Sequence, residues 1–283
     1  MPDQLIIEKG TVRATTEEGL VLERDETALH DMFRAEYALP LGDAALPDGV
    51  KFVEWRSPFL VVVHQTPPHV RRLQWIADDS PRQFGPGTRY HPVRLSLPYV
   101  ITFAVYYQHR HGLSLTASNE LYFRNEPLGS RRDRVGFPAL LNVSAIETPA
   151  RTRAWICTQY LRQPIAADWT AQLDQLLDHT FNGGFNRSSE HHEGASWYGA
   201  SRGVDRSLHP IQKWEQATAA DERFGLRVAW KPAPLCVQEL IEALLAECQQ
   251  SAETQSPPAA SGRTVTLVHR FVNFAQTPGK KAS

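Results

Sequence analysis

The segment from Phe137 to Phe181 reads FPALLNVSAIETPARTRAWICTQYLRQPIAADWTAQLDQLLDHTF, and the interpretation of the whole chain starts from it. It places Cys157 directly after a strand-like run and shortly before Trp169, where an amphipathic run begins. A cysteine in this setting is either a small buried core residue or a nucleophile that carries an acyl group. The functional question turns on which of these two descriptions applies.

Two helices are predicted from the spacing of their apolar residues. The first has its stripe at i, i+3, i+4, i+7 and i+8 and is followed by the stop Gly183-Gly184. Its stripe consists of Leu173, Leu176, Leu177, Thr180 and Phe181. The second follows the same spacing at Val237, Leu240, Ile241, Leu244, Leu245 and Cys248. Because Cys248 lies on this stripe, we expect it to be a buried small hydrophobe.

The sequence before Phe137 predicts strands. Its runs are rich in β-branched and aromatic residues and are separated by Pro, Gly and Asn turns. The runs are FVEW, FLVVVHQT, VRRLQWI, HPVRLSLPYVITFAVYYQ, ELYFRN and ALLNVS. We therefore expect an α+β fold, with a mostly antiparallel meander of four or five strands and flanking helices.

The two ends of the chain are predicted to be extensions of this core. Residues 4–24 have the pattern of a β-hairpin around Gly10, and Asp25 is placed to cap a short helix after it. Residues 251–263 have the composition of a linker, and the run TVTLVHRFVNF beyond them has that of an edge strand. The predicted organisation is an N-terminal extension (1–50), a core domain (51–203) and a C-terminal helix, linker and strand that pack on the core (204–283).

Composition limits the classes of function. The chain has 283 residues, 30 basic and 31 acidic side chains and a formal charge of −1, so nothing in its charge argues for a nucleic-acid or anionic-membrane partner. No apolar run approaches the ~18 residues that cross a bilayer, and the start MPDQLIIEKG is not a secretory signal. The 3 cysteines form no CxxC pair, which argues against a disulfide scaffold and against a zinc site built on sulfur. We expect a cytoplasmic protein.

The residues around Cys157 allow two interpretations. Arg151, Arg153 and Arg162 lie near it in sequence, and cationic neighbours raise the thiolate fraction of a cysteine. Alternatively, Ile156 and Cys157 end a buried strand, since free cysteine is among the most buried residue types.

A second polar cluster lies in the segment Ser188-Ser189-Glu190-His191-His192-Glu193-Gly194. His191, His192 and Glu193 are the residue types that bind a divalent metal or supply a general base. The HExxH spacing of zincins is absent. The segment is therefore a metal site, a polar loop that lines an active site, or a solvated turn or helix N-cap.

The order of features along the chain resembles the catalytic half of ubiquitin-conjugating enzymes. In those enzymes a small antiparallel meander leads to His-Pro-Asn-Val, then Ile-Cys-Leu, then a tryptophan that opens the next helix. The bacterial relatives of that fold, particularly the PRTRC-system protein B group, look most similar. The resemblance covers roughly residues 52–200 and depends on Phe137, Pro138, Asn142-Val143, Ile156, Cys157, Leu161 and Trp169.

This resemblance implies a reaction and its partners. Cys157 would accept the C-terminal acyl group of a ubiquitin-like protein from an activating-type enzyme and pass it to an amine, without a cofactor. Asn142 would donate a hydrogen bond to the tetrahedral oxyanion, and Trp169 would be a structural anchor. His191, His192 and Glu193 have no counterpart in the eukaryotic enzymes, and we expect them near the thiol as the source of a base.

The sequence also departs from the family pattern. The family histidine is absent, because Ala139, Leu140 and Leu141 separate Pro138 from Asn142, and the link from Asn142 to Cys157 is longer than in the family. Two other classes of function therefore stay open. One is a catalytically inactive scaffold or binding subunit of the same fold, with Cys157 buried against Trp155. The other is a metal-dependent hydrolase centred on His191, His192 and Glu193.

Overall fold

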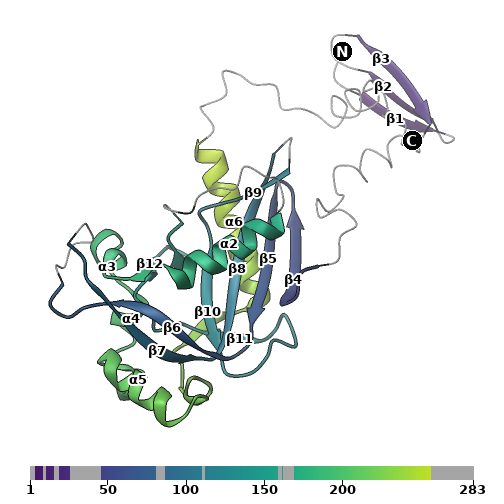
Figure 1. The fold of residues 1–283 in the computed structure, drawn as a ribbon. Coiled ribbons are helices and arrows are strands. Elements are labelled where there is room, and N and C mark those ends of the chain that lie inside the picture. Colours follow the sequence, from purple (N-terminus) through teal and green to yellow (C-terminus); the bar gives the residue numbers. More distant parts are fainter. Residues whose placement is uncertain are drawn as a thin grey trace. The chain divides into compact units, whose positions relative to one another are not determined.

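The computed structural model of the chain describes residues 4–8, 11–15, 19–25, 46–80, 87–109, 112–158, 161 and 169–255 (Figure 1). By their contacts the residues form two compact units, one of residues 1–39 with 252–283 and one of residues 40–251. The second unit contains both the predicted core domain and most of the predicted C-terminal helix. The helix predicted after Asp25 and the strand predicted for TVTLVHRFVNF lie outside the described residues.

The first unit contains a small antiparallel sheet in the order β1-β2-β3. Its strands are β1 (Gln4–Glu8), β2 (Thr11–Thr15) and β3 (Val21–Asp25). The predicted hairpin therefore has a third strand. Gly19 precedes that strand with a φ of 83°, a backbone conformation that glycine adopts without steric cost.

The second unit is built on a nine-stranded sheet whose main path is β12-β13-β10-β8-β5-β4, with β9 beside β8, β11 beside β10 and β15 beside β11. All of these pairings are antiparallel. The strands are β4 (Val50–Arg56), β5 (Phe59–Thr66), β8 (Tyr99–His109), β9 (Gly112–Leu115), β10 (Glu120–Arg124), β11 (Arg134–Gly136), β12 (Val143–Glu147), β13 (Thr152–Ile156) and β15 (Pro232–Cys236).

Between β5 and β8 the chain leaves this sheet to form a second one, in the order β14-β6-β7. Its strands are β6 (His69–Ile76), β7 (Tyr90–Leu97) and β14 (Gly184–Phe185), the last parallel to β6. The long run predicted as one β signal is thus divided at Pro98, because a proline cannot donate a backbone hydrogen bond to a ladder.

All helices of the described residues follow β13 in sequence. Both helices predicted from apolar spacing are confirmed, as α2 (Trp169–Asn182) and α6 (Val237–Gln255). The others are α3 (Ser188–His192), α4 (Trp197–Ala200), α5 (Ile211–Ala220) and the 3-10 turns η1 (Arg206–Leu208) and η2 (Phe224–Leu226). The α+β class with mostly antiparallel sheets is therefore confirmed, but the expected meander of four or five strands is wrong, because the described residues of the second unit form a nine-stranded and a three-stranded sheet. Within the part of the chain that is described, no helix has both the length and the apolar content needed to cross a membrane.

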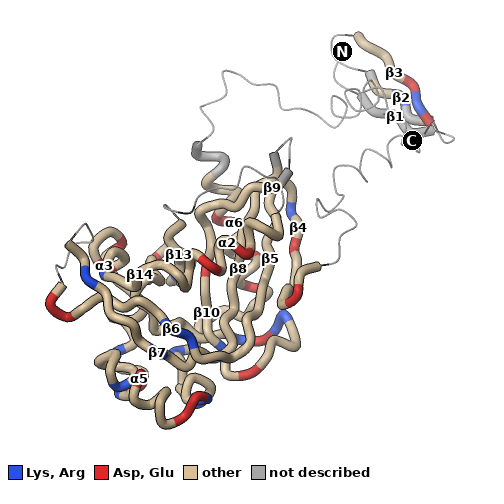
Figure 2. The backbone as a smooth tube through the Cα atoms, in the orientation of Figure 1, with Lys and Arg blue, Asp and Glu red and all other residues tan. Residues whose placement is uncertain are grey.

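Helices cover both faces of the large sheet. On β8, Tyr106 faces α2, since its hydroxyl donates to the carbonyl of Trp169 at 3.1 Å. Phe103 points to the opposite face, because neighbouring strand residues alternate. There its cross-strand partner Glu120 belongs to a charged cluster that includes Glu247 of α6. β5 and β8, at the centre of this sandwich, contain no Lys, Arg, Asp or Glu (Figure 2).

Candidate functional site

The β12–β13 hairpin brings Asn142 and Cys157, which are 15 positions apart in sequence, to the same end of the hairpin. Val143 pairs with Ile156, and the register continues inward from this pair to Glu147 and Thr152. Asn142 and Cys157 are therefore the next positions beyond the open end of the hairpin. Neighbouring cross-strand positions in a regular antiparallel pair lie roughly 5 Å apart. The long link between Asn142 and Cys157 thus returns to its starting point, because it is itself a hairpin.

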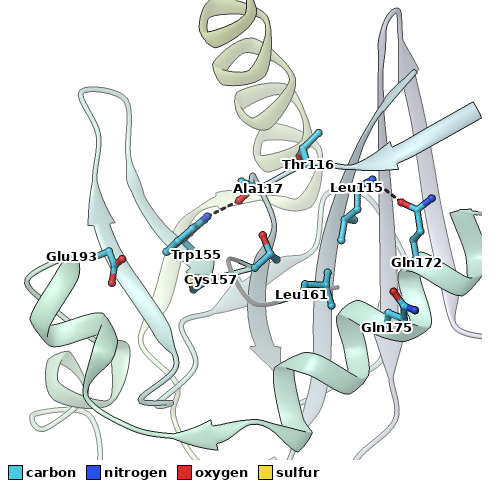
Figure 3. A pocket seen from close by; sticks show the side chains of 10 residues that line it. Leu115, Thr116, Ala117, Trp155, Cys157, Leu161, Gln172, Gln175 and Glu193 are labelled. Carbon is cyan, nitrogen blue, oxygen red and sulfur yellow. Dashed lines mark hydrogen bonds between the residues drawn. The ribbon is translucent and has the colours of Figure 1, made fainter. Parts of the chain in front are cut away.

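Cys157 lies on the boundary of two cavities. The first has a volume of about 320 Å³, the second about 260 Å³, and Cys157 and Glu193 line both. In the first cavity Cys157 lies between Trp155 and Leu161, with Glu193 at the far end from α2 (Figure 3). The thiol residue is half-buried. Because Cys157 is half-buried and lines both cavities, it is not the sealed core residue that one of the two interpretations expected.

Polar side chains of α2 and of the β9–β10 connection shape the first cavity. The side-chain oxygen of Gln172 accepts from the backbone N–H of Leu115 at 2.7 Å, and its amide nitrogen donates to the carbonyl of Leu113 at 2.7 Å. Trp155 donates through Nε1 to the carbonyl of Ala117 at 2.6 Å (Figure 3). These bonds hold the cavity walls to backbone atoms, so the space beside the thiol is preformed.

Asn142 lines the second cavity together with Cys157. Its amide nitrogen donates to the carbonyl of Thr180 at 2.7 Å. A carbonyl only accepts, so this bond fixes which end of the amide is nitrogen. The nitrogen carries a second N–H, whereas Oδ1 is buried without a hydrogen-bond partner. Asn142 thus keeps one donor that is not used by the bond to Thr180.

The structure adds His179, which sequence reasoning missed. Its Nε2–H donates to the carbonyl of Cys157 at 2.9 Å, and the ring lines the second cavity. The only sequence signal is helical spacing: Gln172, Gln175 and His179 lie at i, i+3 and i+7, so one face of α2 follows both cavities. Without the position of Cys157 in space, that spacing does not distinguish His179 from a solvent-facing histidine.

The histidine-rich segment forms α3 and the turn after it. His192 and Glu193 line the second cavity, but His191 lines neither. The Ser144 hydroxyl donates to Oε2 of Glu193 at 3.3 Å. The segment is fastened to β12, because the N–H of Ala145 donates to the carbonyl of Ala195 at 3.0 Å. Of the predicted cluster, two residues therefore reach the thiol's surroundings, and the described residues contain no group of three His, Cys, Asp or Glu arranged to hold a metal.

The arginines near Cys157 in sequence have another partner. Glu120 is fully buried and accepts two hydrogen bonds of 2.7 Å from Arg151 and one of 2.6 Å from Arg153. Arg151 also binds Glu247 of α6. Burial raises the pKa of Glu120, but the hydrogen bonds and charges of the arginines outweigh it and leave this pKa below its ordinary value.

These two arginines therefore stabilise a buried carboxylate rather than a thiolate, and neither lines the cavities beside Cys157. Their contacts therefore do not support the interpretation that they raise the thiolate fraction of Cys157. The third, Arg162, lies outside the described residues.

The other predicted residues keep structural roles. Cys248 is 6% exposed on α6, and burial raises the pKa of its thiol, which confirms the predicted buried position. Trp169 is buried at the start of α2, in edge contact with Tyr106. Cys236 is half-buried at the end of β15.

The fold also brings together a serine and a histidine outside both cavities. The segment from Gly199 to Gly203 has the GxSxG spacing of hydrolase nucleophiles. However, Ser201 ends α4 with a φ of −85° and a ψ of 0°, which is not the strained strand-to-helix turn of that motif. Its hydroxyl donates to the carbonyl of Tyr198 at 2.8 Å and lies 2.9 Å from Nε2 of His209. Because the hydroxyl proton goes to Tyr198, His209 is the donor in this pair, which caps α4.

Comparisons of the chain with models of protein families, with curated proteins and with solved structures find no match.

Proposed function

We propose that this chain carries the C-terminal acyl group of a ubiquitin-like protein as a thioester on Cys157 and transfers it to an amine. The observation that supports this proposal most directly is the position of Asn142 and Cys157. Both lie at the open end of one hairpin and line the same cavity. A half-buried thiol with a hydrogen-bond donor beside it and space on two sides is the arrangement that acyl transfer requires.

The chemistry assigns a role to each group. The thiolate of Cys157 attacks the activated carbonyl, and the bond to the leaving group of the activating-type enzyme breaks as the new C–S bond forms. In the second step an amine attacks the thioester, a C–N bond forms, the C–S bond breaks and the thiolate is released. Both steps pass through a tetrahedral oxyanion, and the unused N–H of Asn142 is the candidate donor to it.

The site supports this reaction over the two alternatives. A scaffold subunit with Cys157 sealed against Trp155 requires a buried thiol, and Cys157 lines two cavities. A metal-dependent hydrolase requires His191, His192 and Glu193 to converge, and His191 does not line the cavity of the other two. The ubiquitin-conjugating fold and a cytoplasmic location belong to the proposal as well, and free thiols at all three cysteines agree with a reducing compartment.

The test is adduct formation. The full chain is incubated with ATP and with an activating-type enzyme and ubiquitin-like protein encoded beside its gene, and the products are weighed by mass spectrometry. We expect an adduct that dithiothreitol removes, because a thioester exchanges with thiols. Cys157→Ala abolishes it. Cys157→Ser retains an adduct that resists dithiothreitol, because an oxygen ester replaces the thioester.

Cys236→Ala is the matched control, since Cys236 is also half-buried but lies at the end of β15, outside both cavities. It should form the adduct at the wild-type level. A wild-type chain that forms no adduct, while its native Cys157 reacts slowly with iodoacetamide, favours the scaffold function instead.

A further inference from the structure

The hydrogen bond between α2 and the nucleophile has a chemical consequence. The ladder of β13 ends at the Val143–Ile156 pair, so the carbonyl of Cys157 lies beyond its last strand partner. His179 supplies the missing donor through Nε2–H at 2.9 Å. An imidazole that donates from Nε2 carries, in its neutral form, a lone pair on Nδ1. No described residue makes a hydrogen bond to that nitrogen.

The position of His179 suits a proton acceptor at the thioester. Its ring is bonded to the backbone of the nucleophile itself and lines the cavity that Asn142 shares with Cys157. That cavity contains the titratable groups His179, His192 and Glu193, whereas Glu193 is the only carboxylate or histidine on the first cavity. An amine that enters through the second cavity therefore meets His179 on the wall that it shares with Cys157.

We propose that His179 accepts the proton of the amine that attacks the thioester on Cys157. This inference rests on the proposed function and names a residue for its second step. The amine nitrogen forms the C–N bond, its proton moves to Nδ1 of His179, and the C–S bond breaks to release the thiolate. The imidazolium then returns the proton to the thiolate, so the enzyme regains its starting state.

His179 is favoured over the two neighbouring bases by its contacts. Among the described residues His192 is exposed and makes no hydrogen bond to Cys157, and Glu193 accepts from the hydroxyl of Ser144 at 3.3 Å. His179 alone among them is fixed to the nucleophile, from a helix whose neighbouring residues Leu176 and Thr180 are buried in the core. A base on a rigid element keeps its distance to the reacting atom.

The experiment separates loading from transfer. A short synthetic peptide with a C-terminal thioester is exchanged onto Cys157 of the full chain, and the loaded protein is then mixed with free lysine. Mass spectrometry follows both steps. His179→Gln keeps an N–H donor for the carbonyl of Cys157 but has no base. We expect it to load within about twofold of wild type and to lose about 100-fold in the rate of aminolysis at neutral pH. The deficit should shrink at alkaline pH, because hydroxide can then accept the proton that His179 takes in the wild-type chain.

His91→Gln is the control, because His91 lies on β7 and lines neither cavity. Aminolysis of loaded His179→Gln at the wild-type rate would overturn the role of His179 and leave the proposed function standing. A deficit in His179→Gln that is the same at every pH, with loading equally slow, would also overturn it, because the histidine then only positions the backbone. A wild-type chain that never loads would overturn the proposed function itself.

Discussion

The two ends of β13 are built in opposite ways. Before its first residue, the buried Arg151 bonds the carboxylate of Glu120, a buried residue whose backbone pairs with Trp155. Beyond its last residue, Cys157 and Asn142 line a cavity, and one oxygen of Asn142 has no partner. One short strand therefore has two roles. The buried ion pairs of Arg151 with Glu120 anchor it, and its last residue leads to the polar cavity of Cys157 and Asn142.

Breaking the closed end should have the largest effect on stability. Arg151→Ala leaves the carboxylate of Glu120 buried without its main partner, and we expect a loss of about 3–5 kcal/mol in the free energy of unfolding. Urea unfolding followed by tryptophan fluorescence measures it, since all 7 tryptophans lie within residues 55–230 and report on the larger unit.

Arg132→Ala is the matched control, because Arg132 is exposed on the loop between β10 and β11 and should change the free energy of unfolding by less than about 0.5 kcal/mol. A loss below about 1 kcal/mol for Arg151→Ala would show that the buried cluster does not anchor β13.

Changing the open end should affect rate more than stability. Asn142→Asp keeps the shape of the side chain but removes both N–H donors, so the proposed oxyanion loses its hydrogen bond. We expect transfer from loaded Cys157 to fall by about 100- to 1,000-fold. The same variant loses the bond to Thr180 and places a carboxylate oxygen against that carbonyl, so its free energy of unfolding should fall by at least about 1–3 kcal/mol.

Single-turnover transfer and urea unfolding of the same preparation give both numbers. Transfer at the wild-type rate would remove Asn142 from the mechanism and leave it as a purely structural link to α2.

Acid should lower the stability of the chain through two histidines that lie away from Cys157. Burial lowers the pKa of His64, and burial and Arg202 lower the pKa of His209 to about 4. The unfolded chain binds these protons more readily, near pH 6.5. The free energy of unfolding should therefore be highest above about pH 6.5 and fall as the pH drops toward the folded pKa values. For the half-buried His209 we expect a fall of about 1–2 kcal/mol after allowance for solvent screening.

Urea midpoints between pH 7 and pH 5 test this, because Glu120, with its lowered pKa, stays ionised in the folded chain over that range. His209→Gln should flatten the profile. A stability that is constant from pH 7 to pH 5 in the wild-type chain contradicts the expectation.

The smallest effect is expected at the outer edge of the ionic cluster. Glu247→Gln removes a charge whose side chain is 19% exposed, while Arg151 keeps both bonds to Glu120. We expect a loss of about 0.5–1 kcal/mol and an unchanged rate of iodoacetamide reaction at Cys157. A loss as large as that of Arg151→Ala would mean that the cluster depends equally on α6.

Part of the site was predictable because its signals are local. The position of Cys157 after a strand, the stripe of α2 and the burial of Cys248 follow from periodicity alone. The same reasoning misjudged Arg151 and Arg153, because closeness in sequence says nothing about which face of a strand a side chain takes. It also overlooked His179, whose role exists only because α2 passes beside the end of β13.

The sequence by itself determined the class of the fold, the two long helices and the presence of a thiol between a strand and a helix. Helical and strand periodicities are properties of residues that are close in sequence, so they can be recognised without knowing which element each helix or strand packs against. Only the tertiary structure decided that Asn142 meets Cys157, that the arginines bind Glu120 and that two cavities meet at the thiol. Those outcomes depend on strand register and on packing between residues that are distant in sequence, where many alternative pairings satisfy the same local pattern.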